Sequence, residues 1–87
     1  MDFIFQEDRI YAEDKKGKIL AEITFPRVDE NTVVIDHTFV DDSLRGQGIA
    51  GQLMEMAVSA IKMQGKKITA TCAYAVRWLE KNGEKLD

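Results

Sequence analysis

The segment Arg45-Gly46-Gln47-Gly48-Ile49-Ala50 constrains this chain most, because it follows a β-type run and opens the one long amphipathic helical pattern. A glycine-rich turn that leads into a helix points several backbone N–H groups at one spot, where the helix dipole also favours negative charge. Arg45 adds a cation, and the two glycines let the backbone approach a bulky anion without a Cβ in the way. The segment therefore predicts a phosphate-binding loop; the alternative is a helix start that happens to be glycine-rich.

The two best-known nucleotide loops do not fit this spacing. Residues 43–50 contain no Gly-Lys-Ser/Thr ending, which excludes a P-loop, and the three-glycine dinucleotide fingerprint is not met. The segment does match the pattern Arg/Gln-x-x-Gly-x-Gly/Ala, with Arg45, Gly48 and Ala50 at its defining positions. In this it resembles the GNAT superfamily of N-acetyltransferases, in which the loop amides bind the pyrophosphate of acetyl-CoA.

Residues 72–83 are similar to a second motif of that superfamily, which reads Asn-x-x-Ala, an aromatic-Tyr pair and Glu-Lys-x-Gly-Phe. The positions that match are Ala75, Glu80, Lys81 and Gly83. Cys72 replaces the asparagine, and Leu79 replaces a tyrosine that is the general acid for the departing CoA thiolate in many relatives. Leucine cannot donate a proton. The chain most resembles the very small acetyltransferase-like proteins, which share the His37-Thr38 pair and the Cys72-Ala73-Tyr74-Ala75 pattern.

The resemblance implies acetyl-CoA as the cofactor and assigns residues to it. Residues 45–50 would hold the pyrophosphate, while the strand edge before the loop would pair with the amide-rich pantetheine arm, as a peptide adds to a sheet edge. The expected cofactor-binding residues are Phe39, Val40, Arg45, Gly46, Gln47, Gly48, Ile49, Ala50 and Ala75.

Three residues are candidates for catalysis, and each also has a structural interpretation. Cys72 is either a buried inert thiol or, at a strand end that opens onto a helix N-terminus, a thiol of lowered pKa that lines the pocket or takes the acetyl group first. His37 shares a strand face with Val33, Ile35 and Phe39, which predicts a core histidine; if that face meets the cofactor, His37 is the best general base. Tyr74 either packs its ring or replaces the missing proton donor. Asp36 and Glu22 are alternative bases.

Hydrophobic periodicity predicts an α+β fold in one domain over residues 1–87, in the order β-β-β-β-α-β-α. The strands are expected over residues 3–6, 9–13, 18–25, 32–40 and 68–72, and the helices over 49–64 and 74–82. The sheet should be mainly antiparallel, with a GNAT-like parallel pair formed by the strands before and after the first helix.

Side-chain spacing predicts the core. The strand over 18–25 alternates, and the helices carry apolar stripes. The residues expected to face the core are Ile19, Ala21, Ile23, Phe25, Ile49, Leu53, Met56, Ala57, Ala60, Ile61, Ala75, Trp78 and Leu79. The methionines Met54, Met56 and Met63 are expected to fill core space rather than to bind metal.

Amino-acid composition limits the classes of binding partner that are expected. A formal net charge of −3 argues against a nucleic-acid partner, and no apolar run or leader segment predicts a membrane partner or secretion. One cysteine cannot form an internal disulfide, which favours the cytoplasm, and one histidine with one cysteine cannot build a zinc site.

The sequence therefore predicts an acyltransferase that moves an acetyl group from acetyl-CoA to an amine. The alternative is a non-catalytic CoA-binding or regulatory interaction module, which the leucine at position 79 favours. The acidic residues before the loop favour a cationic acceptor, such as a protein lysine or a polyamine. A monomer or a weak homodimer is expected.

Overall fold

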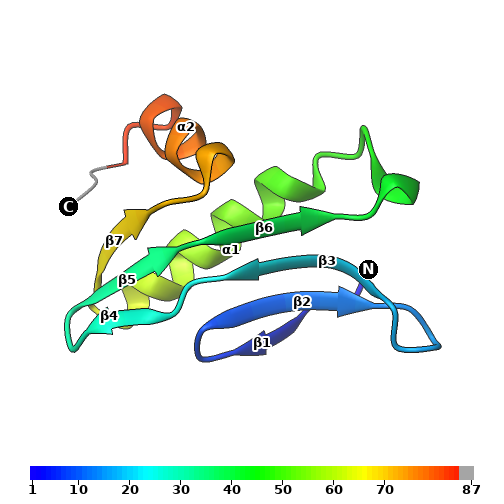
Figure 1. Cartoon of the computed structure of the whole chain (residues 1–87), viewed down its shortest axis with the longest axis horizontal. Coiled ribbons are helices and arrows are strands. Elements are labelled where there is room, and N and C mark those ends of the chain that lie inside the picture. The colour runs from blue at the N-terminus through cyan, green and yellow to red at the C-terminus, as the bar shows by residue number, and fades with distance from the viewer. Residues whose placement is uncertain (85–87) are drawn as a thin grey trace.

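A computed structural model describes residues 1–84 (Figure 1). In chain order its elements are β1 (Ile4–Gln6), β2 (Arg9–Glu13), β3 (Ile19–Thr24), β4 (Arg27–Asp29), β5 (Thr32–Ile35), β6 (His37–Val40), the short 3-10 helix η1 (Asp42–Leu44), α1 (Ile49–Met63), β7 (Lys67–Ala70) and α2 (Ala73–Lys81). The predicted α+β class and the order of the main elements are confirmed. The short strand β4 was not predicted, because the sequence over 26–31 indicates only a break.

The strands form two sheets. One has the order β1-β2-β3-β6 and is antiparallel throughout; the other has the order β4-β5-β7, in which β5 and β7 are parallel. Helix α1 makes the crossover from β6 back to β7, so the predicted parallel pair is confirmed.

The turn between β2 and β3 follows directly from its sequence. The Gly17 N–H donates to the Asp14 carbonyl at 3.0 Å, and Gly17 adopts a φ of 84° that favours glycine. Beyond this turn the alternation of β3 points Ala21, Ile23 and Phe25 into the core, as predicted.

The segment predicted as one strand over residues 32–40 is two strands that belong to different sheets. Asp36 separates them: β5 pairs with β7 up to Ile35, and β6 pairs with β3 from His37 onward. The interruption reverses the inward and outward alternation, because Asp36 and His37 are exposed one after the other. Figure 1 shows β7 diverging from the continuous β5–β6 strand at this point.

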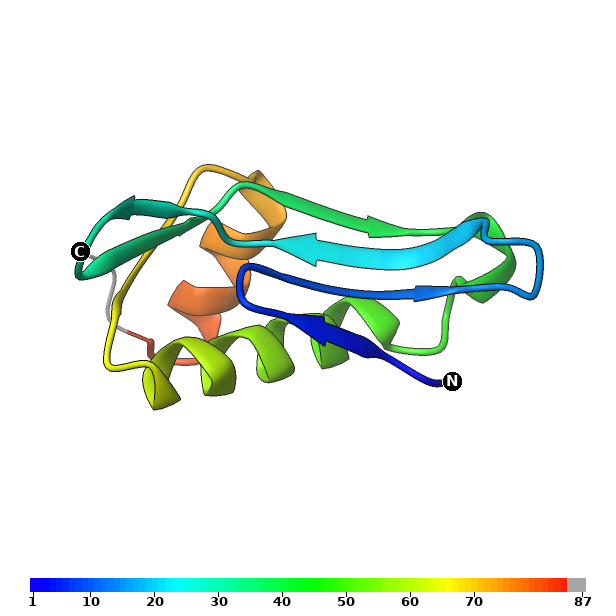
Figure 2. The ribbon, with the colours of Figure 1, turned by 90° about the horizontal axis from the view of Figure 1, so that it is seen from below.

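Helix α1 lies along one face of the β1-β2-β3-β6 sheet, and the opposite face carries no helix among the described residues (Figure 2). The residues of α1 that are buried are Ile49, Leu53, Met54, Ala57, Val58 and Ile61. The prediction for Met63 is wrong, since its side chain is 87% exposed at the end of the helix. The prediction for Met54 is confirmed, and Val58 adds a buried residue that was not predicted.

Helix α2 packs against α1 and β7. Ala75 and Leu79 are fully buried, whereas Trp78 packs at the margin of the core. The Trp78 indole nitrogen lies 3.9 Å from the point where a Cβ on Gly51 would stand. Helix α2 therefore sits beside the first turn of α1, next to the glycine-rich loop.

Candidate functional site

The loop between β6 and α1 is anchored at its start by Asp41. The Asp41 carboxylate accepts hydrogen bonds from the Ser43 hydroxyl at 2.6 Å and the Ser43 N–H at 3.1 Å, and it lies 3.5 Å from the Lys18 ammonium. The hydroxyl of Ser43, more than its N–H, keeps the pKa of Asp41 below the usual value. The Asp41 side chain thereby fixes the turn of η1 that delivers Arg45.

Beyond Arg45 the loop offers an open set of backbone donors. Gly46 and Gly48 have φ values of 80° and 73°, and a Cβ on either would meet no atom within 4 Å. The first backbone hydrogen bond of α1 runs from the Gln52 N–H to the Gly48 carbonyl, and no hydrogen bond among residues 1–84 uses the N–H groups of positions 46–51. These donors and the helix N-terminus fit an anion such as a pyrophosphate.

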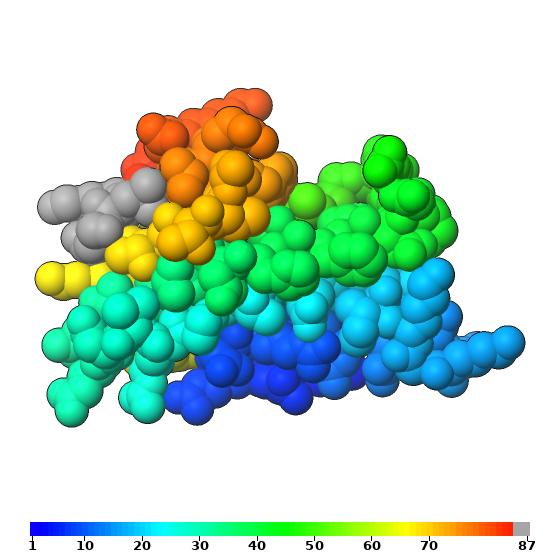
Figure 3. Space-filling model, viewed as in Figure 1, coloured from blue at the N-terminus to red at the C-terminus, as the bar shows by residue number. Residues whose placement is uncertain are grey.

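The same loop borders a hollow of about 300 Å³. Its lining comes from β6, the loop, the first turn of α1 and the first turn of α2: Val40, Leu44, Arg45, Gly46, Gly48, Ile49, Ala50, Gly51 and Tyr74. In the space-filling view it is visible as a notch between α2 and the loop (Figure 3). The Arg45 guanidinium lies 2.9 Å from Asp42, but both side chains are largely exposed, so this weak pair leaves Arg45 available to an anion.

Cys72 lies where β6 and β7 diverge, as the residue that precedes α2. Its Sγ is 3.5 Å from the Thr38 hydroxyl on β6, so these two side chains meet across the gap between the sheets. The free edge of β6 runs along the same gap, because β3 is the only described strand that pairs with β6.

The environment of Cys72 favours its thiolate. Partial burial acts to raise the pKa of the thiol, but hydrogen bonds from the Thr38 hydroxyl and from the N–H groups of Ala75 and Tyr74 outweigh it and lower the pKa below 9.0. The folded protein therefore releases this proton at a lower pH than the unfolded chain. Stability gained from Cys72 develops as pH rises from the folded pKa toward 9.0, and is lost as pH falls through the folded pKa.

We expect Cys72 to react with iodoacetamide faster than glutathione at neutral pH, because its thiolate fraction is larger. The Thr38→Val variant should raise the thiol pKa and slow the reaction severalfold, since it removes one of the hydrogen bonds that stabilise the thiolate. The measurement is the alkylation rate as a function of pH. Thr24→Val, which removes a hydroxyl that bonds Asp36 instead, is the control. Equal rates in all three proteins would show that the thiol is only a packing group.

His37 lies on the face of β6 that points away from α1. Its side chain is 51% exposed, and its Nε2 is 3.3 Å from a carboxylate oxygen of Glu22 on β3, which also binds Arg9. The prediction that His37 is a core residue beside Val33 and Ile35 is wrong, because the interruption at Asp36 reverses the alternation. His37 is instead accessible from solvent.

The structure thus places the expected site residues in several different surroundings. Tyr74 joins Val40 and most of the loop around the 300 Å³ hollow. Cys72 lies at the gap, whereas His37 and Phe39 are exposed on the other face of β6. Ala75 is fully buried, so its side chain is a packing group, although its N–H points at the thiol. Gln47 is exposed and does not line the hollow.

Sequence reasoning gave no role to Thr38, Leu44 or Gly51. Thr38 could have been suspected from the His-Thr pair, but a threonine in a strand carries no local signal of what it faces.

Within residues 1–84, no three His, Cys, Asp or Glu side chains cluster as metal ligands would. None of the described helices is long and apolar enough to cross a bilayer.

Residues 9–87 match the model of the GCN5-related N-acetyltransferase family. The chain belongs to this family. A curated relative, Protein NATD1 from Xenopus tropicalis, is 32% identical over 62 residues, which is 71% of this chain and 57% of that protein. The chain thus spans little more than half the length of this relative.

Solved structures in this family share the fold. The NMR solution structure of a GCN5-like protein from Staphylococcus aureus superposes with a TM-score of 0.77 at 38% identity, covering 93% of this chain and 79% of that one. A GNAT acetyltransferase from Elizabethkingia anophelis, solved with acetyl-CoA bound, gives a TM-score of 0.64 at 19% identity and covers 86% of this chain and 51% of that one. Because the identity to the Elizabethkingia anophelis protein is only 19%, that similarity concerns the fold alone.

Proposed function

We propose that this protein binds acetyl-CoA at the loop before α1 and transfers the acetyl group to an exposed cationic amine. The observation that carries the proposal is the loop itself: unpaired N–H groups at positions 46–51, two glycines with positive φ, and a hollow of about 300 Å³ beside them. Arg45 would add its charge to the pyrophosphate contact.

The free edge of β6 supports the same placement. Its unpaired backbone groups border the gap, so they are available to the amide groups of a pantetheine arm, in the manner of β-strand addition. Acetyl-CoA would supply an activated acetyl thioester. Cys72 and Thr38 stand at the end of β6 where the gap begins, in a position to line that part of the site.

His37 would act as the general base on the other face of β6. With Nε2 turned toward Glu22, its Nδ1 is the nitrogen left to take a proton from the acceptor amine. Arg9 holds the same Glu22 carboxylate and would keep it in place. This arrangement favours direct transfer, with Cys72 as a lining residue; an acyl group carried first by Cys72 is the alternative.

Tyr74 would supply the proton that the leaving thiolate needs. Leu79, at the position of the family's tyrosine, is fully buried and has no proton to donate, but Tyr74, in the first turn of the same helix, lines the hollow. The competing proposal, a CoA-binding module without activity, is supported by that same leucine. Calorimetry with acetyl-CoA followed by CoA release in the presence of amines separates the two: binding without release favours the module, and no binding at all overturns both.

We expect a cationic acceptor to be acetylated faster at low salt than at high salt. Acidic side chains, among them Asp36 and Glu22, lie on the bare sheet face near His37 and would attract an ammonium group. Asp36→Asn should lower kcat/KM for polyamines and lysine peptides by up to about fivefold, the worth of one exposed charge pair. Glu55→Gln, which removes the same charge from an exposed position on α1, is the matched control. Efficient acetylation of a neutral or anionic molecule, with polyamines and lysine peptides inert, would contradict this acceptor class.

A further inference from the structure

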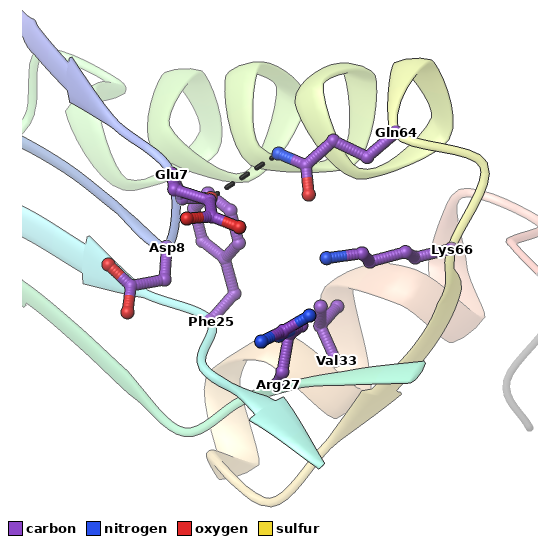
Figure 4. Close-up of a pocket in the computed structure, with 7 residues that line it drawn as sticks. All are labelled: Glu7, Asp8, Phe25, Arg27, Val33, Gln64 and Lys66. Carbon is purple, nitrogen blue, oxygen red and sulfur yellow. Dashed lines mark hydrogen bonds between the residues drawn. The ribbon is translucent and has the colours of Figure 1, made fainter. Parts of the chain in front are cut away.

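A second hollow, of about 150 Å³, lies at the end of α1 remote from the cofactor loop (Figure 4). It is bordered by the β1–β2 turn, the start of β4 and the residues that follow α1. The 15 residues of α1 separate it from the loop by roughly 22 Å at 1.5 Å per residue, so it is not part of the acetyl-CoA site.

The charges around this hollow are separated by sign. Glu7 and Asp8 lie on one side, and Arg27 and Lys66 on the other. Figure 4 shows the Lys66 ammonium and the Arg27 guanidinium pointing toward the Glu7 side. Among the described residues no ion pair joins the two sides, so opposite charges face each other across an open space.

Hydrogen bonds hold the walls in place. The Phe25 N–H donates to the Asp8 carbonyl at 2.8 Å, and the Gln64 side-chain amide donates to the Glu7 carbonyl at 3.3 Å. The Lys66 N–H donates to the Ile61 carbonyl at 3.2 Å. Because these bonds fix the backbone on both sides, the hollow exists before any ligand enters, which lowers the entropic cost of binding.

The floor of the hollow is apolar. Phe25 and Val33 line it, and both are core residues with 1% exposure. The Gln64 carbonyl oxygen faces the space while its amide nitrogen is bonded to Glu7. A ligand would therefore meet an apolar surface below, the Gln64 oxygen and the Glu7 carboxylate at one end, and two cationic donors at the other.

We propose that this hollow binds a small zwitterion, namely an amino acid the size of alanine or β-alanine. The ammonium group would lie against the Glu7 carboxylate and the Gln64 carbonyl oxygen. The carboxylate would lie against Arg27 and Lys66, of which Arg27 can bind it with two parallel hydrogen bonds. A cavity of about 150 Å³ holds roughly six non-hydrogen atoms, as for benzene in an engineered cavity, which matches these ligands in size.

The test is an NMR titration of the full chain with alanine and β-alanine, followed through the backbone amide signals of residues that line the hollow. We expect saturable shifts with a dissociation constant on the order of 1 mM, since the site is small and open. Acetate and ethylamine, which each carry only one of the two charges, should bind at least about tenfold more weakly. Tryptophan should give no saturable shift, because it exceeds the space.

Variants locate the site. Arg27→Gln and Glu7→Gln should each weaken alanine or β-alanine binding about tenfold or more, whereas Lys15→Gln, in the exposed turn before β3, should leave it unchanged. Acetyl-CoA binding should be unaffected in all three, which makes this result independent of the proposed function. Linear shifts up to about 20 mM, equal shifts with acetate or ethylamine, or unchanged affinity in Arg27→Gln and Glu7→Gln would overturn the proposal. In that case the charged side chains around the hollow have no ligand-binding role.

Discussion

Replacing Gly48 with glutamate is expected to abolish acetyl-CoA binding. Position 48 immediately precedes α1 with a φ of 73°, beside the unpaired N–H groups that would hold the pyrophosphate. A glutamate there places a side chain and a like charge in the anion's position. In the native protein, acetyl-CoA at 100 times its dissociation constant should stabilise the fold by about 2.7 kcal/mol; the variant should show no gain. Calorimetry and thermal unfolding with and without ligand measure both effects.

Gly17→Glu is the matched control for this experiment. Gly17 has a φ of 84° and, like Gly48, has no atom within 4 Å of the point where a Cβ would stand, but it lies in the β2–β3 turn. Both variants should therefore carry a similar backbone strain, and only Gly48→Glu should lose the ligand. Retention of acetyl-CoA by Gly48→Glu at native affinity would place the cofactor somewhere other than this loop.

Replacing His37 with alanine is expected to lower kcat/KM for an amine acceptor by about 10² to 10⁴, the usual contribution of a positioned general base. Acetyl-CoA binding should stay unchanged, because His37 is exposed on the bare sheet face and does not line the loop hollow. Initial rates of CoA release together with calorimetry separate these two quantities.

Two further variants sharpen the result. Gln6→Ala changes an exposed residue of β1 in the same sheet and should leave the rate unaffected. Cys72→Ala distinguishes the two routes: a modest loss is consistent with direct transfer, whereas inactivity with intact cofactor binding favours a covalent role for the thiol. A rate in His37→Ala within about tenfold of the native rate would remove His37 as the base.

The loop and the parallel pair were predictable because their signals are local. A positive φ requires glycine at positions 46 and 48, and a βαβ order implies a parallel pairing whatever its surroundings. The strict alternation over β3 likewise determined which side chains point into the core. In these segments the sequence pattern and the tertiary structure agree.

The face of His37 could not be read from the sequence, because apolar residues fall on both faces of the segment 32–40 and no alternation assigns one face to the core. The break at Asp36 arises from tertiary structure: Ile35 still accepts hydrogen bonds from Thr71 and Cys72, while the Asp36 N–H already donates to Thr24. The strand changes partner between two adjacent residues, and that change reverses which side chains face α1. The Thr38–Cys72 contact follows from the same event, so it was missed as well.

Two predictions failed: Met63 was expected in the core, and residues 26–31 were expected only as a break between strands. Met63 follows Met56 at helical spacing, but at 100° per residue it lies about 200° around the helix from the buried Ile61, so it is on the exposed face. Strand β4 is only three residues long, all of them exposed, and it exists because β5 offers it a partner. Apolar periodicity gives no signal for such a strand.

The parallel pairing of β5 with β7 bears on the order in which the protein acquires its site during folding. Thr32 pairs with Lys67, 35 residues later in the chain, whereas the strands of the N-terminal hairpins pair across short turns. Closing the longer loop costs more chain entropy, and α1 must be in place before that pairing is rewarded. Cys72 and Tyr74 follow β7, so Cys72 reaches Thr38 and Tyr74 reaches the glycine loop only at this step. Acetyl-CoA binding would then require the completed fold, and a chain in which only α1 and the loop had formed would not bind it.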